Sequence, residues 1–218
     1  MNDLWPALER SLSYASLATL LVGLVGIPVA YLLARTRFIG KNLVEAVLTL
    51  PLVLPPTVVG YFLIVTFGHR GWIGRWLGVS ITFQWYGAVL AAAVVAFPLL
   101  VLPAKAAFAS IDPEMHDMAR LMGAGRVRTF WRIALPLAGR GIAAGLLLAL
   151  ARSLGEFGAT VMVLGDFSPS RTLPISIYDA SATGGIDSTE ARMAVALLTG
   201  LSMLIVLIHN RAPASRGW

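Results

Sequence analysis

The stretch ASLATLLVGLVGIPVAYLLA, residues 15–34, runs for twenty residues without a charged side chain. A helix needs about 20 mainly apolar residues to cross the hydrocarbon core of a bilayer. Two further stretches, 46–67 and 86–104, are of similar length and also lack Asp, Glu, Lys and Arg. The sequence therefore predicts an all-α integral membrane protein.

The composition agrees with this fold class. Of the 218 residues, 57% are hydrophobic and only 13% are charged, whereas soluble domains carry about a quarter charged residues. Cysteine is absent, which excludes disulfides and thiolate metal sites. There is no internal repeat or linker, so we expect a single transmembrane domain over residues 1–218.

Hydropathy predicts five spans, at 12–34, 43–67, 86–108, 141–163 and 191–208. Lys and Arg concentrate in the connections 35–42 and 105–140 and in the C-terminal tail. By the positive-inside rule these segments face the cytoplasm, so the N-terminus lies outside and the C-terminus is cytoplasmic. The net charge of +6 thus reflects topology, and we expect no nucleic-acid partner. The first ten residues lack the pattern of a cleaved signal peptide, so the first span is expected to be retained.

Pro55, Pro56 and Thr57 lie near the middle of the second expected span. Proline removes an intrahelical hydrogen bond, which predicts a break at this point. Freed backbone groups at membrane depth are tolerated where they face protein or a water-lined pathway. The alternative is a kink that serves only packing.

Arg152 and Glu156 are ionisable residues inside the fourth expected span, which makes them candidates for function. They are one helical turn apart, so the alternative is an internal ion pair that fixes this helix. In the functional interpretation, Arg152 lines an anion pathway and Glu156 keeps it from trapping the substrate. Gly155 and Gly158 flank Glu156 and favour close helix packing, or a gate.

The segment 111–136, IDPEMHDMARLMGAGRVRTFWRIALP, predicts helix, glycine turn and helix. Asp112 is a good N-cap, and acidic residues suit the first turn. Gly123 or Gly125 supplies the left-handed residue that ends the helix. The apolar stripe of the first helix consists of Met115, Met118, Ala119 and Met122, with Glu114, Asp117 and Arg120 off it. Such a segment fits either lipid headgroups or the groove of a partner protein.

The order of residues distinguishes these two interpretations. Asp117-Met118-Ala119, three residues, Gly123, nine residues, Ile133, one residue and Leu135-Pro136 resemble the EAA loop of ABC importer permeases. Asp117 and Met118 depart from the Glu and Ala of that pattern. The resemblance implies that 111–136 is a cytoplasmic coupling segment, between spans three and four, that docks on a separate ATPase. The chain itself contains no phosphate-binding P-loop motif, so we expect no catalytic residues and no enzyme activity in this subunit.

The resemblance covers nearly the whole chain. LPLVLPPTVVGY (50–61), GAVLAAAVVAFP (87–98) and ALARSLGEFGAT (149–160) resemble the molybdate ABC transporter permeases. This implies a homodimer in the lipid of a bacterial or archaeal cytoplasmic membrane, with two ATPase subunits and an extracytoplasmic molybdate-binding protein. ATP and Mg would be bound by the ATPase, and no cofactor by this chain. Tungstate and sulfate are the alternative substrates.

Two other classes of function were weighed. A membrane enzyme would use Arg152 and Glu156 as an acid and a base, but neither HExxH nor GxSxG is present. A channel or secondary transporter would not need a long amphipathic cytoplasmic segment. His69, His116 and His209 lack metal-ligand spacing, so no metal site is expected. In the expected external loop 166–190, hydroxyls that could donate to an oxyanion are carried by Thr172, Ser176 and Tyr178.

Overall fold

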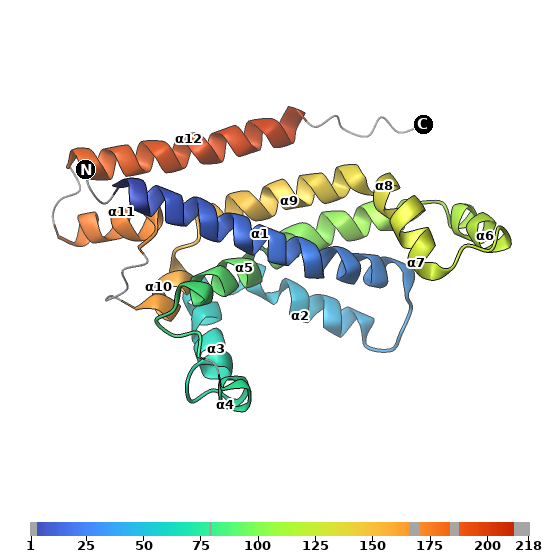
Figure 1. The fold of residues 1–218 in the computed structure, drawn as a ribbon, viewed down its shortest axis with the longest axis horizontal. Coiled ribbons are helices and arrows are strands. Elements are labelled where there is room, and N and C mark those ends of the chain that lie inside the picture. The colour runs from blue at the N-terminus through green and yellow to red at the C-terminus, as the bar shows by residue number, and fades with distance from the viewer. Residues whose placement is uncertain (1–3, 79, 166–170, 184–187, 212–218) are drawn as a thin grey trace.

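The fold was analysed in a computed structural model that describes residues 4–78, 80–165, 171–183 and 188–211. Every regular element in these residues is helical (Figure 1). The elements are α1 (Leu4–Arg35), α2 (Lys41–Val53), α3 (Pro56–Phe67), α4 (Trp72–Leu77), α5 (Trp85–Ala109), α6 (Pro113–Leu121), α7 (Arg126–Thr129), the π-helix η1 (Phe130–Ala134), α8 (Leu135–Leu137), α9 (Gly139–Leu154), α10 (Gly158–Leu164), α11 (Leu173–Ala182) and α12 (Thr189–Arg211). The all-α prediction is confirmed.

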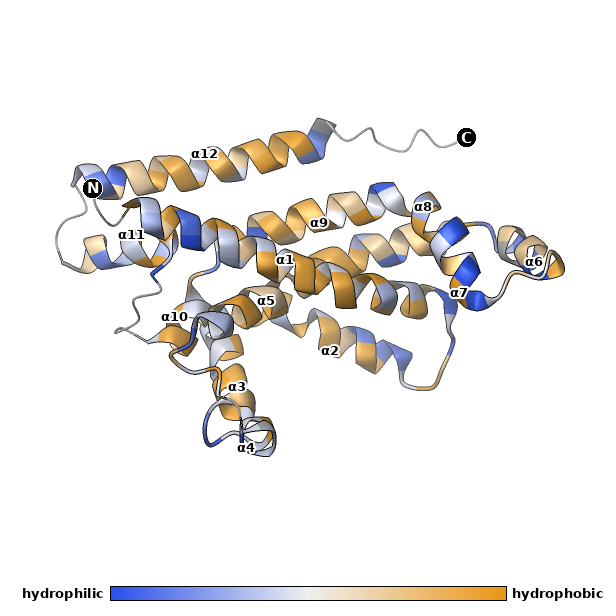
Figure 2. Ribbon diagram, in the orientation of Figure 1, coloured by the Kyte–Doolittle hydropathy of each residue, from blue (hydrophilic) through white to orange (hydrophobic). Residues whose placement is uncertain are grey.

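Three helices, α1, α5 and α12, are individually long and apolar enough to cross a membrane. They correspond to the first, third and fifth expected spans. Two bent helix pairs also meet these criteria, so the described residues contain three to five candidate spans. Figure 2 shows that hydrophobic residues make up much of α1, α5 and α12, and many large ones, such as Leu20, Leu24 and Met203, are exposed.

α5 is the central helix and packs against both α1 and α9 (Figure 1). Its buried residues include many alanines, which let the neighbouring helices come close. On α9, Gly141 and Gly145 form a GxxxG pair against α5, and a Cβ added at Gly141 would lie 2.5 Å from the Cβ of Ala107. Small residues on both helices therefore set the contact at the centre of the fold.

The second expected span is broken at the prolines, as predicted. α2 ends at Val53, and α3 begins at Pro56, with an angle of 119° between α2 and the helical segment Pro56–Trp76. Pro55 is the N-cap of α3, and Pro56 occupies its first turn, where a missing N–H costs nothing.

The fourth expected span, 141–163, is not one continuous helix. α9 ends at Leu154, and α10 begins at Gly158. The break needs no proline, because the Glu156 side chain accepts a hydrogen bond from the Ala159 N–H at 2.8 Å and so caps α10. A second bend, of 74°, separates Arg126–Leu137 from α9.

The basic connections lie at one end of the molecule. The turn between α1 and α2 and the segment from α6 to α8 share this end, whereas α11 and the first turns of α1 and α12 lie at the other; α12 runs from there to about the middle of the molecule (Figure 1). The charge pattern predicts this grouping, because it places the basic segments on one side of the membrane.

The expected external loop 166–190 contains a helix, α11, that the sequence analysis did not predict. Leu173 is fully buried, and its N–H donates to the Ser11 Oγ of α1 at 2.8 Å. Within that loop, residues 166–170 and 184–187 lie outside the described residues. α11 is thus attached to the N-terminal part of α1.

Candidate functional site

The helix α6 begins and ends as the sequence predicts. The Asp112 carboxylate accepts from the Glu114 N–H at 3.0 Å, and Pro113 is the first helical residue. At the other end, Gly123 has φ +76°, its N–H donates to Arg120 O, and the Ala124 N–H donates to Ala119 O, both at 2.9 Å. This is a Schellman motif, so Gly123 rather than Gly125 is the left-handed residue.

α6 exposes an apolar surface. Met118 is 61% exposed, and Met122 is 86% exposed. Leu121 is 89% exposed. The sequence analysis did not include it in the stripe, but its spacing of three residues from Met118 places it on the same face. Ala119, which we assigned to the stripe, is only 5% exposed and faces inward. We call the exposed set the α6 tip; it comprises Met115, Met118, Leu121 and Met122.

An aromatic cluster connects the end of this segment to the transmembrane helices. The ring centroid of Tyr31 on α1 lies 4.9 Å from that of Phe130 on η1 and 5.2 Å from that of Phe108 on α5. At the N-terminal end of the segment 111–136, just before α6, the carbonyl of Ile111 accepts a hydrogen bond from Arg35 Nη2 of α1 at 3.2 Å. These contacts join both flanks of α6 to α1 and, through Phe108 and Phe130, to α5.

The motif residues Ile133, Leu135 and Pro136 lie where this segment turns into α9. Leu135 packs against the main core, and its N–H donates to Phe130 O in the π-helical register. Pro136 has no N–H to donate to the carbonyl four residues earlier, and in an α-helix its ring would clash with that carbonyl. The wider π-helical turn relieves this clash. These residues shape the backbone rather than add to the α6 tip.

The two helix breaks lie against each other. A Cβ added at Gly158 would be 2.9 Å from the Cβ of Pro56, and one added at Gly60 would be 2.7 Å from the Cβ of Met162 and 3.0 Å from Ala159 Cα. α3 and α10 thus cross almost in backbone contact. Gly155 is different, because its nearest neighbour would be Ala151 O at 3.9 Å.

We expect Gly60→Ala to destabilise the protein by about 1–3 kcal/mol, because the added methyl group overpacks a crossing that has no flexible side chain to move. Gly155→Ala is the matched control and should change the stability by less than about 1 kcal/mol. The comparison is of the thermal unfolding midpoints of the two purified variants. Equal midpoints would show that the helices do not cross closely in the membrane.

Arg152 and Glu156 form an ion pair at the break between α9 and α10. Arg152 Nη1 lies 2.7 Å from Glu156 Oε2, and Glu156 Oε1 accepts from Ala159. Both carboxylate oxygens of this buried residue are thereby engaged, while 29% of the Arg152 side chain is exposed. The expected internal ion pair is present, and part of the Arg152 side chain remains accessible.

A small polar cavity lies beside this ion pair, and its volume is about 10 Å³. Ser153 and Thr172 line it, and their buried hydroxyls find no hydrogen-bond partner among the described residues. The volume is close to that of one water molecule and far below that of a tetrahedral oxyanion. The cavity thus has room for about one water molecule beside Thr172. Ser176 donates to Thr172 O at 3.2 Å, and the ring of Tyr178 packs on Phe157 at 4.9 Å.

Comparison with known proteins defines the class first. The fold is that of the membrane subunits of ABC importers. An inward-facing structure of the MetNI methionine ABC transporter superposes with a TM-score of 0.72 at 21% identity, and the superposition covers 95% of this chain and 93% of that chain. A bacterial alginate ABC transporter, in complex with an alginate pentasaccharide-bound periplasmic protein, superposes with a TM-score of 0.68 at 21% identity. The superposition covers 94% of this chain and 76% of that chain.

The sequence then specifies the family. The model of the binding-protein-dependent transport system inner membrane component matches residues 26–212, and the chain belongs to this family. The molybdenum transport system permease protein ModB of Escherichia coli K12 is 46% identical over 211 residues, which cover 94% of this chain and 92% of that protein.

Proposed function

We propose that this chain is the membrane subunit of an ATP-driven importer that moves molybdate across the cytoplasmic membrane of a bacterium or archaeon. The observation that carries the proposal is the 46% identity to a molybdenum permease over nearly the full length of both proteins. Charge and hydropathy alone do not distinguish one tetrahedral dianion from another. Tungstate and sulfate are therefore the alternative substrates, and the competition experiment below separates them.

In this proposal the end of the molecule that carries the α6 tip faces the cytoplasm, with the N-terminus outside. The excess of Lys and Arg at that end supports the orientation. The α6 tip docks in a groove of a separate ATPase subunit, which binds ATP and Mg. An exposed, methionine-rich apolar surface on a short helix supports a protein contact.

The complete transporter would contain two copies of this chain, two ATPase subunits and an extracytoplasmic binding protein. The alginate transporter in complex with its periplasmic protein supports this arrangement by fold. The substrate would pass at the seam between the two copies, past the residues at the helix breaks: Pro55, Pro56, Thr57, Arg152, Gly155, Glu156 and Gly158. Because Glu156 neutralises Arg152, the anion would be held weakly enough to leave.

A channel, a secondary transporter or a membrane enzyme would work without an ATPase. The experiment is to reconstitute the chain with its ATPase in lipid vesicles and to measure ATP hydrolysis with the binding protein, loaded or empty. We expect hydrolysis to rise several-fold with the molybdate-loaded binding protein. Hydrolysis that is indifferent to the binding protein, together with ATP-independent transport, would overturn the proposal.

A further inference from the structure

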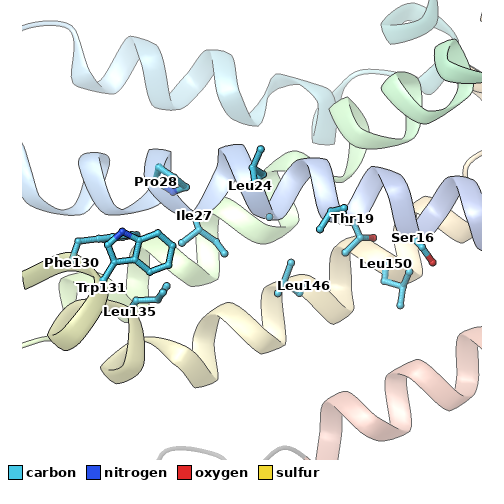
Figure 3. A pocket seen from close by; sticks show the side chains of 12 residues that line it. Ser16, Thr19, Leu24, Ile27, Pro28, Phe130, Trp131, Leu135, Leu146 and Leu150 are labelled. Carbon is cyan, nitrogen blue, oxygen red and sulfur yellow. The ribbon is translucent and has the colours of Figure 1, made fainter. Parts of the chain in front are cut away.

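An apolar groove of about 660 Å³ runs along the outside of α1, between α1 and α9. Figure 3 shows Leu24 and Ile27 of α1 along one wall, Leu146 and Leu150 of α9 along the other, and Phe130 and Trp131 at one end. The polar side chains in its lining are Ser16 and Thr19. The Thr19 hydroxyl already donates to Ala15 O at 2.7 Å. The groove thus offers hydrocarbon contact and little hydrogen bonding, which suits an alkyl chain.

The length of the groove matches one leaflet of a bilayer. On α1 it extends from Ser16 to Pro28, about 18 Å at 1.5 Å per residue. Half of the hydrocarbon core is about 15 Å thick. The end at Trp131 is the end nearer to α6 and the basic connections. Trp131 is 61% exposed, as is typical of an indole at the level of the headgroups.

Positive charge marks that same end. Arg128 in α7 and Arg132 in η1 lie within three residues of Trp131 in the chain, at this end of the groove. Both are exposed, and neither makes an ion pair with any residue in the described part of the chain. An occupant with an alkyl chain in the groove would hold its polar end beside these two guanidinium groups, which favour phosphate.

We propose that this groove binds an anionic phospholipid of the leaflet at the α6 end, with one acyl chain along α1 and the phosphate beside Arg128 and Arg132. A second copy of the chain fits less well. A second copy would have to fill this concave groove with a protruding segment, whereas an acyl chain fills it directly and its phosphate can lie beside the two guanidinium groups. The site does not depend on which anion is transported. It lies next to Phe130, so the lipid would brace the aromatic cluster that joins η1 to α1 and α5.

The test measures phospholipid retention by the full chain, with its ATPase, after delipidation in detergent, using native mass spectrometry with added phosphatidylglycerol or phosphatidylcholine. We expect one phosphatidylglycerol per chain to be retained in preference to phosphatidylcholine. Arg128→Gln combined with Arg132→Gln should weaken this binding roughly 30-fold, about fivefold per guanidinium. The matched control, Arg37→Gln with Arg140→Gln, removes the same charge from exposed positions that do not line the groove and should leave binding unchanged.

A second arm tests the acyl site. Leu24→Gln places an amide in the groove wall and should weaken phosphatidylglycerol binding, whereas Leu17→Gln, on the same helix and outside the groove, should not. The proposal would be overturned if the double arginine variant weakened phosphatidylglycerol binding no more than its control, and Leu24→Gln no more than Leu17→Gln. Equal retention of phosphatidylglycerol and phosphatidylcholine would also overturn it. Because the chain has no cysteine, a single Leu24→Cys variant reports on the other occupant. Efficient disulfide cross-linking between two copies in the membrane would assign the groove to an interface instead.

Discussion

Glu156→Ala is expected to lower the stability of the purified protein by about 3–5 kcal/mol, one of the largest effects of any single substitution in the chain. The change leaves the Arg152 guanidinium without its buried partner and the Ala159 N–H without its acceptor. The break between α9 and α10 then loses both interactions that define it. The measurement is the yield of monodisperse protein and its thermal unfolding midpoint in detergent. A midpoint equal to that of the unmodified protein would contradict the ion pair.

A double variant separates the structural role of this pair from a role in transport. Replacing both charges, with Arg152→Met and Glu156→Gln, removes the uncompensated ion and keeps an acceptor for Ala159, so most of the lost stability should return. If Arg152 contacts the anion, uptake remains low in this well-folded variant. Uptake at the unmodified level would remove Arg152 from the pathway. The single variant Arg152→Ala should reduce uptake more than assembly.

Met118→Asp is expected to weaken the association with the ATPase by at least about 30-fold, because it places a charge at the centre of the α6 tip. The measurement is co-purification of the ATPase, followed by titration in detergent. Arg120→Asp is the matched control, since it introduces the same side chain on the same helix but off the tip. Among the described residues, Arg120 forms an ion pair with Asp117. Both side chains are exposed, so this ion pair contributes little to stability.

A specific loss with Met118→Asp would identify the α6 tip as the docking surface. Equal losses with both variants would indicate that charge, not apolar contact, controls the association. Undiminished binding with both would contradict the coupling role of α6 while leaving the fold and the family unchanged.

Local signals in the sequence predicted a large part of this fold. Continuous apolar runs located α5 and α12 within about three residues at each end, because the bilayer dictates their length. They also located the end of α1, which begins at Leu4 rather than at the expected residue 12. The turn chemistry of Asp112 and Gly123 located both ends of α6. The paired prolines located the break between α2 and α3, since proline acts within its own turn.

Features that depend on distant contacts could not be predicted in this way. The break after Leu154 results from the Glu156 carboxylate capping α10, and a Glu in an apolar run carries no such signal. α11 is ordered by contacts with α1, such as the bond from Leu173 to Ser11, which is 162 residues away. Ala119 is buried although periodicity places it with the exposed methionines, because spacing alone does not show where the rest of the chain lies.

In the proposed function, an ABC importer carries molybdate through this chain. The most direct test is the uptake of labelled molybdate by vesicles that contain the ATPase and the binding protein, with and without this chain, in the presence of unlabelled tungstate or sulfate. The account predicts ATP-dependent molybdate uptake that requires the chain and that excess sulfate does not abolish. Uptake that is equal without the chain, or that is lost to sulfate while molybdate competes poorly, would contradict it.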